Sequence, residues 1–130
     1  MDSTPSSVRK GVYALALATV VTILYIWSDR GAWEAAARMS PLMLVMFIGV
    51  NGFFFASLAL TWRRQNWARW VAIIWSTLAV LAVLTSWVLF GAHIGAERIA
   101  QTLVVALQMW GCYQLLTKSA SLWFRQSASA

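Results

Sequence analysis

Residues 61–70 read TWRRQNWARW, which places three arginines and three tryptophans within ten positions. Such a mixture of cations and aromatic rings has two interpretations. It is either a nucleic-acid-binding patch on a soluble domain or the connection between two membrane helices at the lipid headgroups. The segments on either side decide between them, because only the second interpretation requires both neighbours to be long and uncharged.

The composition favours the membrane. The 130 residues are 61% hydrophobic and only 11% charged, with a net charge of +6. A water-soluble domain carries about 25% charged residues, so this chain has too few polar side chains to cover a soluble domain of its length. The excess of Lys and Arg is therefore expected in the loops of a membrane protein, and we predict no nucleic-acid partner.

Four runs in the chain contain no Asp, Glu, Lys, Arg or His: residues 11–27, 41–61, 71–90 and 99–117. As helices they would extend about 25–31 Å, which matches the hydrocarbon core of a bilayer. They are apolar on all sides rather than alternating, which favours helices over barrel strands. Ser40 and Pro41 are typical of a capped helix start. The predicted fold class is an all-α membrane protein with four transmembrane helices in an antiparallel bundle.

The segments outside the four runs are assigned as tails. Residues 11–117 form the predicted transmembrane domain, preceded by a cytoplasmic tail over residues 1–10. Residues 118–130 are predicted to be a cytoplasmic interfacial segment and tail, in which SASLWFR (119–125) forms a brief helix among the headgroups. No cleavage site adjoins the first run, so we expect it to remain as a span rather than to be removed as a signal peptide.

The cations are unevenly distributed between the two sides of the membrane. Seven lie in the two tails and the 61–70 connection: Arg9, Lys10, Arg63, Arg64, Arg69, Lys118 and Arg125. Three lie on the other side: Arg30, Arg38 and Arg98. The positive-inside rule then predicts a bacterial inner-membrane protein with both termini in the cytoplasm. We interpret TWRRQNWARW as an inner connection that contacts lipid headgroups through Arg63, Arg64 and Arg69.

A weak internal similarity relates the two halves of the chain. An offset of 60 residues aligns Trp27 with Trp87 and Arg38 with Arg98. The similarity reflects either a duplicated helical hairpin, giving two parallel repeats, or the shared constraints on two similar hairpins.

Residues that could carry chemistry are scarce within the four runs. All four acids, Asp2, Asp29, Glu34 and Glu97, lie outside them. A resemblance to the small multidrug resistance antiporters would require a carboxylate in the first run, where only the hydroxyls of Thr19 and Thr22 occur. The chain departs from that family on this point, and we do not assign it there.

Metal and nucleophile chemistry are equally poorly supported. His93 is the single histidine and lies in an outer loop. Met39, Met43 and Met46 have helical spacing, but they lie at the opposite end of the predicted bundle from Cys112. We therefore predict no catalytic residue, no metal, no cofactor and no enzymatic activity.

Uncharged polar side chains within the runs remain as candidates for a binding site. Asn51 lies near the middle of the second run, and Gln101, Gln108 and Cys112 share a helix face in the fourth. Further candidates are Thr19 and Thr22 in the first run and Ser76, Thr77, Thr85 and Ser86 in the third. These groups either bond the helices to one another or line a path for a small solute, with Asn51, Gln101 and Gln108 as the candidate binding residues.

Two short motifs, RQNWARW (64–70) and SLWFR (121–125), resemble segments of small four-span bacterial inner-membrane proteins of uncharacterised function. The resemblance implies a fold and a location, and no catalytic residue. The predicted function is a non-catalytic integral membrane protein that acts through helix or lipid contacts, as an accessory subunit, assembly partner or immunity-type protein. Its partners would be membrane lipids and either further copies of itself or another membrane protein. The alternative is a small oligomeric transporter or channel with a polar path.

Overall fold

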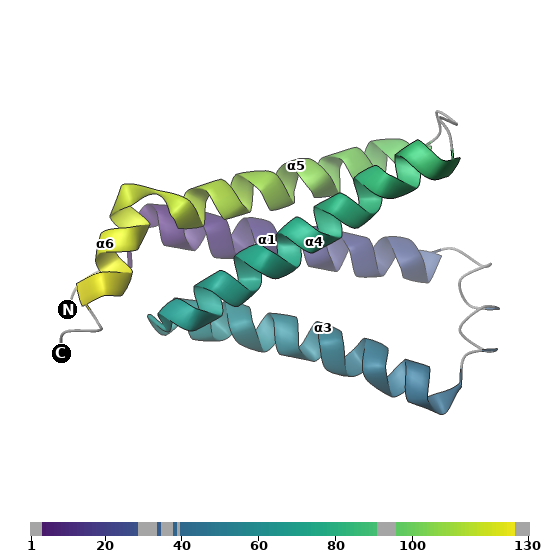
Figure 1. Ribbon diagram of the computed structural model, residues 1–130, viewed down its shortest axis with the longest axis horizontal. Coiled ribbons are helices and arrows are strands. Elements are labelled where there is room, and N and C mark those ends of the chain that lie inside the picture. Colours follow the sequence, from purple (N-terminus) through teal and green to yellow (C-terminus); the bar gives the residue numbers. More distant parts are fainter. Residues whose placement is uncertain (1–3, 29–33, 35–37, 39, 91–95, 127–130) are drawn as a thin grey trace.

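The computed structural model describes residues 4–28, 34, 38, 40–90 and 96–126. Five helices have described bounds: α1 Ser6–Ser28, α3 Pro41–Trp62, α4 Asn66–Phe90, α5 Ala96–Leu116 and α6 Lys118–Gln126 (Figure 1). Four of these, α1, α3, α4 and α5, are long and apolar enough to cross a membrane. The predicted fold class is therefore confirmed, and the predicted short helix near residues 119–125 is present as α6.

Two of the helices begin earlier in the sequence than the predicted spans. α1 begins at Ser6 and α4 at Asn66, each five residues before the predicted start. The apolar runs mark only the hydrocarbon thickness, whereas helical hydrogen bonding continues into the interface. The start of α3 agrees with the prediction, since Ser40 Oγ accepts a hydrogen bond from the Met43 N–H at 3.4 Å and Pro41 is the first helical residue.

α1 and α5 form the most extensive helix pair, and two glycines set their separation. A Cβ atom built on Gly11 would lie 3.0 Å from the carbonyl oxygen of Gly111, and one built on Gly111 would lie 3.1 Å from that of Gly11. Leu15 and Leu115 are fully buried beside this crossing. The two backbones therefore touch directly, as small residues permit in membrane helix pairs.

The interior is concentrated at one end of the bundle. The start of α1, α6 and the α3–α4 connection lie at this end, which we call the α6 end (Figure 1). A single buried cluster contains Val8 of α1, Leu58 of α3, Leu115 of α5 and Phe124 of α6. By contrast, every residue of α3 over positions 41–50 is exposed. The bundle is thus closely packed at the α6 end and open along the other half of α3.

The two predicted hairpins are not packed alike. α4 and α5 pack against each other, whereas α1 packs far more extensively on α5 than on α3. α1 and α3 meet at the α6 end, where the ring centroids of Tyr13 and Trp62 are 5.6 Å apart. The side chain of Trp27, one landmark of the 60-residue similarity, lies outside the described residues. A true duplication therefore stays a prediction.

Candidate functional site

The connection between α3 and α4 is a three-residue turn over residues 63–65. The Arg64 N–H donates to the Thr61 carbonyl at 3.2 Å, and the Gln65 N–H donates to the Leu60 carbonyl at 3.0 Å. This pair of bonds is the Schellman motif, and Arg64 occupies the position at which glycine is usual, with a φ of 66°. Because arginine is strained in that conformation, we expect its side chain to make stabilising contacts, and it does.

Arg64 and Arg69 both turn towards α6. The Cζ atom of Arg64 lies 4.7 Å from the ring centroid of Trp123, and that of Arg69 lies 4.9 Å from the ring centroid of Phe124. Each geometry is a cation–π contact, which is worth about 0.5–2 kcal/mol depending on desolvation. The two arginines therefore fasten α6 onto the connection.

This arrangement corrects part of the predicted headgroup contact. Arg69 is only 6% exposed, and its Nη1 donates to Ser121 Oγ at 3.3 Å. Its guanidinium is therefore directed at α6 rather than at the headgroups. Arg63 is exposed, whereas Arg64 is half-buried. Headgroup contact by Arg63 and Arg64 stays a prediction, and at Arg69 the docked α6 leaves little surface for it, which sequence position alone does not reveal.

The left-handed backbone conformation of Arg64 can be tested by substitution. We expect Arg64→Gly to be about 1 kcal/mol more stable than Arg64→Ala, because a residue with a Cβ is strained at this φ and glycine is not. Both variants lack the contact with Trp123, so the difference isolates the backbone. The free energy of unfolding in mixed detergent micelles measures it. Equal stabilities would show that Arg64 does not adopt the left-handed conformation.

The three candidate amides do not converge. Asn51 Nδ2 donates to the Phe47 carbonyl of its own helix at 2.8 Å. Gln101 Oε1 accepts a hydrogen bond from Trp87 Nε1 at 2.7 Å, which joins α5 to α4 near the end of the bundle away from α6. Gln108 is buried, and its Oε1 has no partner among the described residues. Asn51 and Gln101 therefore each make a hydrogen bond within the bundle, whereas Gln108 Oε1 makes none among the described residues.

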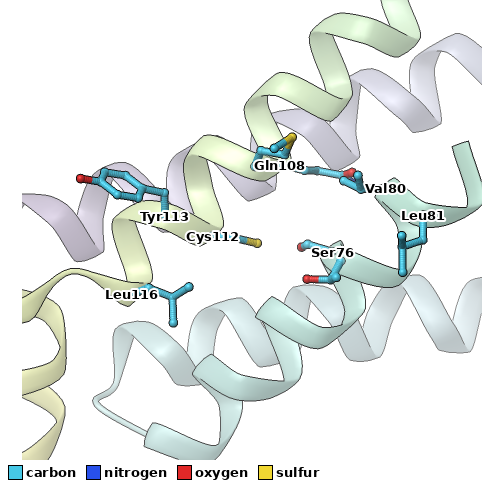
Figure 2. Close-up of a pocket in the computed structure, with 9 residues that line it drawn as sticks. Ser76, Val80, Leu81, Gln108, Cys112, Tyr113 and Leu116 are labelled. Carbon is cyan, nitrogen blue, oxygen red and sulfur yellow. The ribbon is translucent and has the colours of Figure 1, made fainter. Parts of the chain in front are cut away.

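Gln108 lines a cleft of about 340 Å³ between α4 and α5. Ser76 of α4 and Cys112 of α5 line it as well, and Figure 2 shows the Cys112 thiol directed across the gap towards Ser76. The structure thus brings Ser76, from the third predicted helix, together with Gln108 and Cys112, from the fourth. Most of the remaining lining is apolar.

Gln101 lines a different and smaller cavity, of about 220 Å³, among α1, α4 and α5. The only other polar side chains there are those of Thr22 and Tyr25. The hydroxyl of Thr22 donates to the Ala18 carbonyl at 2.8 Å. Asn51 lines neither cavity. The polar face predicted on the fourth span is therefore divided between two cavities.

A second surface feature runs along α3. Small or short side chains recur at intervals of four and three residues: Val45, Gly49, Gly52, Ala56 and Ala59. We call this row the α3 seam. All five residues are exposed, and the opposite face of α3 carries the buried Phe54 and Leu58. No atom outside the neighbouring α3 backbone lies within 4 Å of a Cβ built on Gly49 or Gly52.

Two of the residues considered for metal binding, Met39 and His93, lie outside the described residues. Met43 and Met46 are exposed on α3. Within the described part of the chain, no three His, Cys, Asp or Glu side chains come together. The expected absence of a metal, a cofactor and an enzymatic activity stays a prediction.

No protein-family model matches this chain, and no curated protein or solved structure is significantly similar to it. The resemblance of RQNWARW and SLWFR to four-span bacterial membrane proteins therefore stays a prediction.

The role of α6 was missed at the sequence level. Its buried residues, Ala120, Trp123 and Phe124, follow the i, i+3, i+4 spacing of a one-sided helix, whereas Leu122 is exposed. This spacing was available in the sequence and could have predicted that the segment packs on the bundle. The hydrogen bond between Ser7 Oγ and Ser119 Oγ, at 2.9 Å, had no sequence signal.

Proposed function

We propose that this chain is a non-catalytic accessory subunit of the bacterial inner membrane, with both termini in the cytoplasm, and that it binds a transmembrane helix of another membrane protein along the α3 seam. The observation that carries the proposal is the exposure of a row of short side chains, from Val45 to Ala59, along a membrane-spanning helix.

The orientation is supported by the grouping of charge. The start of α1, the α3–α4 connection and α6 lie together at the α6 end (Figure 1), and they carry Arg9, Lys10, Arg63, Lys118 and Arg125. An excess of Lys and Arg is typical of the cytoplasmic side of inner-membrane proteins.

The glycines of the chain support a helix as the partner. The structure describes four glycines, and all lie within helices. Gly11 and Gly111 touch at a helix crossing, whereas Gly49 and Gly52 face open space. A glycine within a helix costs about 1 kcal/mol relative to alanine, and close approach of a second helix is what offsets that cost in membranes. For Gly49 and Gly52, the second helix would come from another protein.

The chemistry of the seam restricts the partner further. The exposed residues of α3 over positions 41–50 are all uncharged, and the spacing of the seam matches the period at which one helix follows another. A water-soluble protein would not reach this surface in the hydrocarbon region. The transporter alternative is less well supported, because Asn51, Gln101 and Gln108 do not share one cavity.

Site-specific crosslinking in cells tests the proposal. We expect a photoreactive amino acid at Val45 or Ala56 to yield a discrete adduct with a second protein, because both positions lie on the seam. The same amino acid at Phe47 or Val50 should not, because these positions lie on the opposite face. Gly52→Leu should abolish the adduct from Val45. Lipid adducts alone, equal yields from both faces, or an adduct made only of two copies of this chain would contradict the accessory role.

A further inference from the structure

Two buried polar atoms line the cleft between α4 and α5, and one of them, Ser76 Oγ, faces the Cys112 thiol, which is only a weak hydrogen-bond partner. Ser76 is 1% exposed and Gln108 is 8% exposed, and neither Ser76 Oγ nor Gln108 Oε1 has a hydrogen-bond partner among the described residues. An unsatisfied polar group of this kind costs about 1–3 kcal/mol. No water is available at hydrocarbon depth to remove that cost.

Ser76 differs in this respect from the hydroxyls around it. Several threonines and serines in the spans donate to the carbonyl four residues earlier: Thr19, Thr22, Ser57, Thr61, Thr77, Thr85 and Thr102. Thr77, the next residue along α4, is among them, at 2.8 Å from the Ile73 carbonyl. The Ser76 hydroxyl makes no such bond and faces the Cys112 thiol instead (Figure 2), a weak partner that a ligand hydroxyl can replace.

The walls of the cleft determine how a ligand would enter. They include Leu81, Met109 and Tyr113, which are 53%, 61% and 67% exposed. The rim therefore opens sideways, towards the acyl chains of a bilayer, and Figure 2 shows Leu81 and Tyr113 on opposite sides of the opening. A ligand would arrive from within the membrane, and a long apolar tail could stay in the lipid while its head enters the cleft.

The two polar atoms specify the head group. Gln108 Oε1 can only accept a hydrogen bond, whereas the Ser76 hydroxyl can donate one. A ligand hydroxyl satisfies both atoms at once, because it can donate to Gln108 and accept from Ser76. No lining residue is charged, so a carboxylate or phosphate head would be buried without a counter-charge, at a much higher cost.

We propose that the α4–α5 cleft binds a neutral lipid with a free hydroxyl group, held by Ser76 and Gln108. The volume of about 340 Å³ lies within the range of small-molecule sites, about 300–1,000 Å³, and accommodates the head group and the first part of its chain. This site is separate from the α3 seam, and it does not depend on the accessory role.

Photolabelling of the full chain in lipid nanodiscs tests the proposal. The probe is hexadecanol with a diazirine near the hydroxyl, compared with the matched alkane and the matched fatty acid. We expect the alcohol to label peptides of α4 and α5 about five-fold more than the alkane, as the loss of a hydrogen bond predicts, and the acid to label them no better than the alkane. Unlabelled dioleoylglycerol or undecaprenol should compete.

Variants identify the polar atoms responsible. Gln108→Leu should reduce labelling by the alcohol to the level of the alkane. Thr85→Val removes a hydroxyl of α4 that is already bonded to the Leu81 carbonyl, and it should leave labelling unchanged. Equal labelling of the wild-type protein by alcohol and alkane would overturn the proposal without recourse to any variant. So would competition by neither lipid, or alcohol labelling that is retained in Gln108→Leu.

Discussion

Gly11→Leu is expected to lower the free energy of unfolding by about 3 kcal/mol or more, one of the two largest effects that we expect from a single substitution in this chain. Even a single Cβ atom at position 11 would lie 2.9 Å from Leu115 Cγ and 3.0 Å from the carbonyl oxygen of Gly111. A side chain can rotate away from such a contact, but the α5 backbone cannot. The substitution must therefore separate α1 from α5 along their most extensive interface.

Thermal unfolding in mild detergent, monitored by circular dichroism or by tryptophan fluorescence, measures this effect. Gly52→Leu is the matched control, since a Cβ atom built there meets no atom within 4 Å beyond its own helix backbone and chain neighbours, and the higher helix propensity of leucine makes a small gain in stability the expected result. A stable Gly11→Leu variant would show that α1 and α5 do not cross at these glycines. Because Gly52→Leu should fold normally, its effect on crosslinking from the seam can be attributed to partner binding.

Phe124→Ala is expected to cost about 3–5 kcal/mol, the range found for removing a buried aromatic side chain. Phe124 is 1% exposed and is the largest of the fully buried side chains. Its ring centroid lies 5.0 Å from that of Trp123 and 4.9 Å from the Arg69 guanidinium carbon. The alanine variant would therefore lose apolar burial and a cation–π contact together, and α6 would detach from the bundle.

Limited proteolysis and thermal unfolding together distinguish detachment of α6 from global loss of structure. In Phe124→Ala, cleavage after Arg125 or Lys118 should become faster at temperatures at which the four spans remain helical. Leu122→Ala is the control, because Leu122 lies on the same helix and is 59% exposed; a change within about 0.5 kcal/mol is expected there. If the two variants were equally stable, α6 would not be docked through its buried face.

Local signals were sufficient to predict the four spans. Each run of uncharged residues corresponds to a helix, and Ser40-Pro41 marks the start of α3 as predicted. The choice of helix neighbours was not predictable in the same way. In lipid, all faces of a span are apolar, so the periodicity that identifies the buried face of a soluble helix is absent. The contact of Gly11 with Gly111 depends on two positions far apart in the sequence, and neither is unusual by itself.

The candidate site was likewise predictable only in part: residues that share one helix could be grouped, but their neighbours on other helices could not. The sequence singled out Gln108 and Cys112 as sharing a helix face, and the structure adds Ser76 from α4 to make a cleft. Asn51 looked equally suitable but bonds to its own helix through Phe47. Whether a buried amide meets its own backbone, a neighbour or an empty space depends on rotamer and packing, and sequence position carries little information about either.

The cluster at the α6 end also constrains how the protein is made. It joins Val8, near the beginning of the chain, to Phe124, near the end of α6. Until α6 has been synthesised, the surfaces of α1 and α4 that it covers stay uncovered. Assembly is therefore completed only once α6 has docked, and before that point the bundle presents a transient apolar surface that a chaperone or a quality-control protease could recognise.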